Sequence, residues 1–230
     1  MKRNALLLLA LLAIGSPVFA QSPTVRYAFA GNANDLSGNG RHGTAVSSAS
    51  IGPATLTIPE DASSYLSIPV SAAHGLNDFT VTAAVQLDPV HAPGPGAQLN
   101  VVLAGANAAD DNALMIAYQF TVGSWRVEIG SGHAGNPSQF FFVPTGSRPG
   151  PGIWQHIAYV RRTVLGSTTG TFYLNGAQLG SSISLTGPSS VAPLNIAPGG
   201  LLAGQEQDAV GGAFQSRQSL KGSLGELTIY

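Results

Sequence analysis

The sequence contains no cysteine, few charged residues and only one long apolar run, and each shortage limits what the protein can be. Without cysteine, disulfides cannot stabilise the fold, so stability must come from a buried core or a bound metal. Charged residues make up only 9% of the chain, against a typical share of about 25%. No basic cluster is present that could hold phosphates, so we expect no nucleic-acid partner.

The one long apolar run lies at the start of the chain. Lys2 and Arg3 precede apolar residues 5–14, and the small-residue segment 18–20, Val-Phe-Ala, follows. This order is typical of a secretory signal peptide, and the run is shorter than the roughly 20 residues that span a bilayer. We therefore expect cleavage after residue 20, no membrane span, and a secreted or periplasmic protein. The mature chain would carry eight basic and eleven acidic residues, a net charge of −3.

Short apolar runs separated by 29 glycines and 15 prolines predict many strands joined by tight turns. Apolar and polar residues alternate over 79–87, as in a strand with one buried face. Asn175-Gly176 predicts a hairpin within 171–179, because a type I′ turn needs positive φ at both central residues. Further strands are predicted at 24–30, 64–69, 98–104, 113–121, 123–130, 139–143, 153–162, 192–197 and 223–230.

No segment after residue 20 keeps a helical period over twelve residues, although 71–77 could form one short turn. About a dozen strands in a mature chain of this length favour one all-β domain over residues 21–230. Two packed antiparallel sheets are the natural way to bury so many short strands.

The stretch YAFAGNANDLSGNGRHGT at residues 27–44 resembles the opening strand and loop of laminin-G-like, concanavalin A-like jelly-roll domains. Three later parts of the chain are similar to the same family in the same order: residues 78–83, 154–161 leading into 173–176, and 222–230. The resemblance implies a two-sheet antiparallel jelly-roll β-sandwich in which the first and last strands are neighbours in one sheet.

The same resemblance implies a structural calcium ion. Its ligands would be Asp35, carbonyl oxygens near Gly38 and Gly40, and an acidic residue of the last strand, here Glu226. Calcium takes six to eight oxygen ligands, which glycine-rich loops can bring close together.

This chain departs from the family at two positions that bear on that ion and on local packing. Gly225 stands where the family usually has an acidic residue, and Ala84 stands where it often has tryptophan. The alternative role for Asp35 is an aspartate turn, in which its carboxylate accepts the N–H of the residue two positions on. The sequence leaves both roles open.

The acidic residues do not form the pattern of a glycosidase. Glu206 and Asp208 have the spacing of a pair on one strand face but lie in a polar, loop-like segment, and the Glu-x-Asp-x-x-Glu pattern of related glucanases is missing. Retaining glycosidases need two carboxyl groups about 5–5.5 Å apart. The sequence also lacks a Gly-x-Ser-x-Gly elbow and metal-ligand spacing among its histidines. We therefore predict a protein that is not an enzyme, with no facing carboxyl pair on the concave sheet.

Aromatic residues are the remaining functional signal, because sugars stack on exposed rings. The alternative for each aromatic residue is a buried position in the core. We predict a non-catalytic, carbohydrate-binding module; an adhesion or envelope-structural domain with protein partners is the alternative, and a glycoside hydrolase is the least favoured. The candidate stacking rings are Trp125, Tyr118, Tyr159 and Phe141, and the candidate polar rim residues are Asn112, Asp111 and His133.

Overall fold

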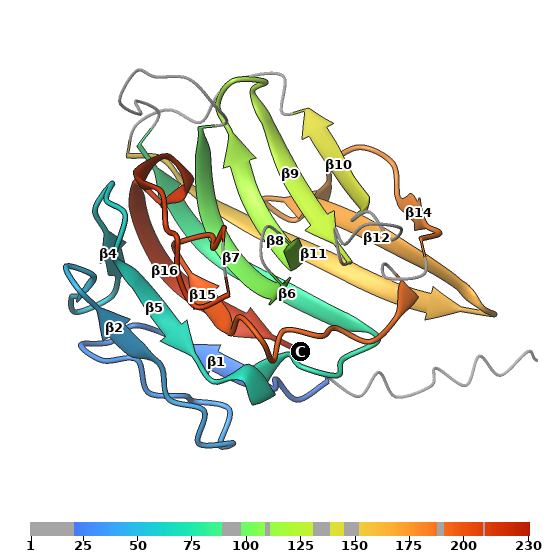
Figure 1. Cartoon of the computed structure of the whole chain (residues 1–230). Coiled ribbons are helices and arrows are strands. Elements are labelled where there is room, and N and C mark those ends of the chain that lie inside the picture. The colour runs from blue at the N-terminus through green and yellow to red at the C-terminus, as the bar shows by residue number, and fades with distance from the viewer. Residues whose placement is uncertain are drawn as a thin grey trace, which may run out of the picture.

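The computed structural model describes residues 21–88, 98–108, 111–130, 139–144, 152–187, 191–208 and 210–230. Within these ranges the chain forms two antiparallel β-sheets that stack face to face (Figure 1). Two single 3₁₀ turns, η1 (Val70–Ala72) and η2 (Ser216–Gln218), lie outside the sheets. This is the all-β jelly-roll sandwich that the sequence predicted.

The first sheet, called sheet I, has the strand order β13-β12-β11-β6-β16-β4-β3, with β1 also paired to β16 and β14 to β12. Its centre is β6, which pairs with both β11 and β16. The strand bounds are β1 (Val25–Tyr27), β3 (Ser50–Ile51), β4 (Leu56–Ile58), β6 (Phe79–Leu87), β11 (Trp154–Val164), β12 (Ser167–Leu174), β13 (Ala177–Gln178), β14 (Ile183–Leu185) and β16 (Gly222–Ile229).

The second sheet, called sheet II, has the strand order β10-β9-β8-β7-β15-β5-β2. Its long central strands pair through most of their length, which gives this sheet an extended outer face. The strand bounds are β2 (Thr44–Val46), β5 (Tyr65–Ile68), β7 (Leu99–Ala108), β8 (Asp111–Gln119), β9 (Ser124–Ile129), β10 (Gln139–Pro144) and β15 (Leu201–Ala203).

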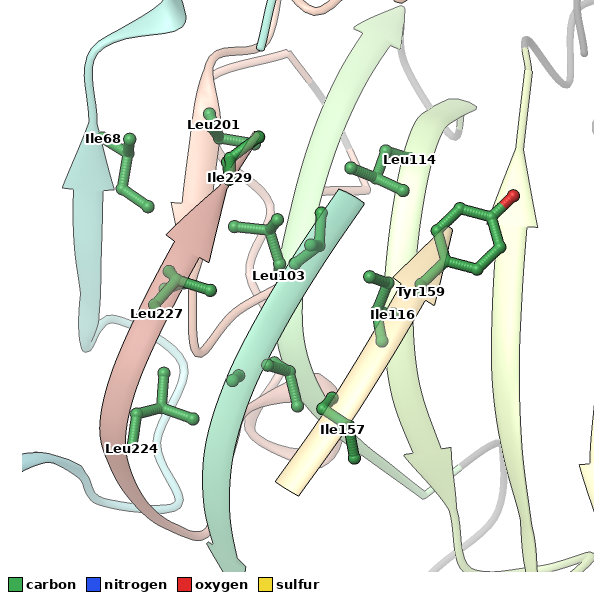
Figure 2. Packing of buried hydrophobic residues seen from close by; sticks show 14 of the residues in the cluster. Ile68, Leu103, Leu114, Ile116, Ile157, Tyr159, Leu201, Leu224, Leu227 and Ile229 are labelled. Atoms are coloured by element: carbon green, nitrogen blue, oxygen red, sulfur yellow. The ribbon is translucent and has the colours of Figure 1, made fainter. Parts of the chain in front are cut away.

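The hydrophobic core lies between the sheets, where alternate residues of each strand point inward. In β6 the burial alternates residue by residue along the whole strand, as its sequence predicted. Figure 2 shows the two inner faces meeting, with inward side chains from both sheets in one layer. The labelled members are Ile157 and Tyr159 of β11, Leu224, Leu227 and Ile229 of β16, Leu103 of β7, Leu114 and Ile116 of β8, Ile68 of β5 and Leu201 of β15.

Two further predictions about strand pairing are confirmed. β1 lies antiparallel beside β16, with Val25 opposite Ile229 and Tyr27 opposite Leu227. Asn175 and Gly176 form the turn between β12 and β13, and both have positive φ angles, 51° and 81°.

The strand predicted at 192–197 is wrong, and the strand that lies near it in sequence is β15. The backbone of Leu194 bonds with the segment before β6: it donates to Leu76 and accepts from Gly75. The guanidinium of Arg161, itself buried, donates to the Ala192 carbonyl at 2.8 Å. This segment is apolar because it covers one side of the core, not because it joins a sheet.

Candidate functional site

The aromatic rings predicted to stack on sugar lie in the core. Trp125, Tyr118 and Tyr159 are each fully buried between the sheets. The Trp125 ring centre is 5.6 Å from that of Tyr118 and 5.3 Å from that of Phe172. The prediction of a sugar-stacking role is therefore wrong for these three residues, because their rings are enclosed by other side chains.

The remaining predicted rim and ring residues divide into described and undescribed positions. Phe141 lies in β10 and Asp111 begins β8, but their side chains are outside the described part of the structure, as is all of His133. Asn112 is described and lies on β8. Its amide bonds with Glu206, on the side of the sheet opposite to Tyr118 and Trp125.

The carboxylate of Asp35 is the hub of the opening loop. Its Oδ1 accepts the backbone N–H groups of Arg26 and Ser37 at 3.0 and 2.8 Å. Its Oδ2 accepts the Ser37 hydroxyl at 2.8 Å and the Arg41 N–H at 3.0 Å. Burial alone would raise the pKa of Asp35, but these hydrogen bonds lower it to about 2.

This arrangement does not fit a calcium ion on Asp35. An ionised carboxylate offers about four lone-pair positions, and four donors already occupy them. Glu226, the other predicted carboxylate ligand, accepts from Arg26 Nε at 3.3 Å and from the Thr228 hydroxyl at 3.0 Å. Within the described ranges no three His, Asp or Glu side chains gather as metal ligands. The geometry matches the alternative from the sequence, an aspartate turn whose glycines Gly38 and Gly40 take positive φ.

A second polar cluster lies on the outer face of sheet II. The register between β7 and β8 shifts so that Gly105 pairs with Leu114 and Ala106 with Asn112, which leaves Ala113 as an extra residue. This bulge turns Asn112 to the outer face, where its amide donates to Glu206 Oε1.

Glu206 is the group of that cluster with a raised pKa. Burial, together with the negative charges of Glu128 and Asp208, raises its pKa to about 7, although Asn112 and Arg126 oppose the shift. Glu128 itself pairs with Arg126 at 2.9 Å. The sequence analysis did not anticipate this pair of neighbouring carboxyl groups. The two glutamate residues are each only 7% exposed, so both carboxyl groups are buried.

The outer face of sheet I carries an exposed aromatic ring that the sequence analysis did not select. Trp154, at the start of β11, is 42% exposed, whereas the other tryptophan, Trp125, is fully buried. A methyl group added to Gly225 of β16 would lie 3.2 Å from Cζ3 of Trp154 and 3.5 Å from the Cβ of Ala84. The indole therefore reaches from β11 to β16.

That reach fixes the orientation of the ring. The strand order is β11-β6-β16, and neighbouring strands are about 4.8 Å apart. To approach Gly225 the indole must cross β6, so its long axis runs along the sheet, and 42% of Trp154 stays exposed to solvent. A larger residue at either 84 or 225 would lift the ring. Ala84 and Gly225, the two departures from the family pattern, thus together leave room for the indole of Trp154.

Polar side chains surround Trp154 on the same face of sheet I. His156 and Glu226 are both in register with Ala84, on opposite sides of it. Gln86 lies opposite Trp154 and donates to the Gly152 carbonyl at 2.8 Å. A pocket of about 250 Å³ lies next to Gln86 on this face and is lined by Gln86, Leu87, Asp88, Gly152 and Gly222. We call the surface of Trp154, Gln86, Ala84, His156 and Glu226 the Trp154 face.

A signal for Trp154 was present in the sequence. In the segment 154–161 the residues Ile157, Tyr159 and Arg161 share one strand face, and Trp154 falls on the other. Only the pairing with β6 and β16, however, brings the ring over two small residues that lie about 70 positions away along the chain in each direction.

A family model described as the concanavalin A-like lectin/glucanase superfamily matches residues 60–230. The chain therefore belongs to that superfamily. A search of curated protein sequences finds no match.

Several solved structures share the fold at low sequence identity. Domain 4 of AbnA, a GH43 extracellular arabinanase from Geobacillus stearothermophilus in complex with arabinotriose, has a TM-score of 0.58 and 18% identity, with 91% of this chain and 92% of that one covered. Trypanosoma rangeli sialidase has a TM-score of 0.58 and 17% identity, with coverage of 90% and 30%. The receptor-binding domain of botulinum neurotoxin type G has a TM-score of 0.57 and 9% identity, with coverage of 91% and 48%.

Proposed function

We propose that this protein is an exported, non-catalytic carbohydrate-binding module and that it binds sugar on the Trp154 face. The observation that carries the proposal is the indole of Trp154, which reaches across sheet I to Gly225 and is 42% exposed. A flat, rigid ring of this kind can cover the C–H face of a sugar ring, and nearby polar groups can bond its hydroxyls.

The groups around Trp154 suit binding better than bond cleavage. Glu226 is half-exposed and forms an ion pair with Arg26 at 3.3 Å, and its carboxylate oxygens can accept hydrogen bonds from sugar hydroxyls. Glutamine, histidine and serine side chains supply further donors and acceptors, and Ser223 already shares a hydrogen bond with Thr57 at 3.2 Å. The arabinotriose complex of the AbnA domain supports a sugar ligand for this fold.

The test is affinity electrophoresis of the mature protein in gels that contain arabinan, xylan, β-glucan or polygalacturonate. We expect retardation in at least one neutral gel. Trp154→Ala should weaken that binding by at least about tenfold, whereas Trp154→Tyr should retain much of it because a flat ring remains. Leu165→Ala is the matched control, since Leu165 is a fully exposed apolar residue at the β11–β12 turn.

Two outcomes would overturn the proposal. If the Trp154→Ala variant binds as well as the wild type, the ring is not the site. If the wild type binds none of the four polysaccharides and none on a broader glycan array, the protein is not a sugar binder of this kind. Retention of a protein partner that Trp154→Ala abolishes would then favour the adhesion or envelope-structural alternative.

A further inference from the structure

A second aromatic residue shares the outer face of sheet I with Trp154. Tyr173 of β12 alternates with the buried Phe172 and is partly exposed. It pairs with Ala158 of β11, and Ala158 in turn pairs with Thr82 of β6. Tyr173 therefore lies on the same face as Trp154, four residues further along β11 and one strand over.

The register gives the separation of the two aromatic positions. Four residues at about 3.4 Å each and one strand spacing of about 4.8 Å place the two backbone positions on the order of 14 Å apart. This distance exceeds the width of one sugar ring. Both rings could therefore act together only on a ligand of several units.

Small residues and one exposed histidine make up the surface between the two rings. Along β11 the outward residues after Trp154 are His156, which is exposed, and Ala158. Ala84 and Thr82 of β6 lie beside them. The two aromatic residues, with His156 between them, form a track along this face of sheet I.

Two cations beside this track near Trp154 are already matched with carboxylates. Arg26 pairs with Glu226 at 3.3 Å. Lys221 pairs with Glu60 at 3.3 Å and with Asp88 at 3.6 Å. An acidic sugar would have to compete with these carboxylates for the two cations, so this end of the track suits an uncharged chain.

We infer that the Trp154 face, if it binds sugar as proposed above, takes an uncharged oligosaccharide chain that extends from Trp154 to a second subsite at Tyr173. The first subsite supplies the stacking contact, and the second adds affinity only when the ligand is long enough to reach it. The ligand length needed for full affinity is therefore set by the separation of Trp154 and Tyr173, which the strand register fixes.

The experiment is isothermal titration with arabino-, xylo- and cello-oligosaccharides from the monosaccharide to the hexasaccharide, and with oligogalacturonates as the acidic series. Affinity should rise with length in one neutral series and level off once the chain spans both rings. Tyr173→Ala should lower the affinity for the hexasaccharide about three- to tenfold and leave the disaccharide unchanged. Tyr65→Ala is the matched control, because Tyr65 is a partly buried tyrosine of sheet II that packs on Phe214.

The outcomes separate this inference from the proposed function. If affinity depends on Trp154 but does not rise with length, or if Tyr173→Ala weakens short and long ligands equally, the second subsite is refuted and the binding face stands. Tighter binding of oligogalacturonates than of the neutral series would refute the uncharged ligand. If no oligosaccharide binds, the proposed function itself fails.

Discussion

Replacing Glu206 by glutamine should remove a pH-dependent cost to stability. The pKa of Glu206 is raised from its ordinary 4.5 to about 7, first by burial and then by the charges of Glu128 and Asp208. Between these two values the folded protein keeps its proton while the unfolded chain has lost it. Stability must therefore fall as pH rises through this window.

The size of the effect follows from the width of the window. Each unit of pKa difference corresponds to about 1.4 kcal/mol, so a shift from 4.5 to about 7 amounts to about 3 kcal/mol. The loss begins near pH 4.5 and is complete above pH 7, where both states are ionised. Glutamine has nearly the same shape, can still accept from the Asn112 amide, and carries no charge at any pH.

The assay is urea unfolding of the wild type and Glu206→Gln at intervals from pH 4 to pH 8.5. The free energy of unfolding of the variant minus that of the wild type should increase by about 3 kcal/mol across this range. Taking the difference cancels the contributions of other titrating groups. Asp208→Asn should lower the pKa of Glu206, because it removes one of the charges that raise it. The pH range over which stability falls should then be narrower. A difference that stays constant from pH 4 to pH 8.5 would refute the reasoning.

Two further predictions concern the opening loop and the platform beneath Trp154. Asp35→Ala leaves four donors without their acceptor and should lower the free energy of unfolding by about 2–4 kcal/mol in urea titrations. If that turn is complete without a metal, millimolar calcium and chelator should leave the melting temperature unchanged; a rise of several degrees with calcium would show that the loop rearranges around the ion. Gly225→Leu should lift the Trp154 ring and weaken polysaccharide retardation without unfolding the protein, and unchanged retardation would contradict this placement of the ring.

The fold was predictable because its determinants are local or follow from a family motif. Alternation over 79–87 defines β6 without reference to any other strand, and Asn175-Gly176 defines its hairpin through backbone preference alone. The resemblance of the opening stretch placed the first strand beside the last, which the register of Val25 and Ile229 confirms. The aspartate turn at Asp35 could also be predicted, because its partner Ser37 is two residues away along the chain.

Which aromatic rings are buried was not predictable in the same way. β8 is apolar on both faces: Leu114 and Ile116 join the main core, while Met115 and Ala117 belong to a second cluster on the outer side. A run of this kind does not indicate which face is enclosed, so Tyr118 could not be assigned to the core from its own segment. Its burial depends on the packing of the other sheet.

The sequence by itself determined the class of the fold, the strands of strong alternation and the turns, because each depends on residues that are neighbours along the chain. Tertiary structure alone decided which aromatic rings meet solvent and which carboxyl groups meet each other. Trp154 reaches across sheet I only because β6 and β16 present Ala84 and Gly225 beneath it. The pKa of Glu206 is raised only because folding buries its side chain and brings Glu128 near it from a distant strand. Burial and electrostatic fields are properties of the assembled sheets, and no single segment carries them.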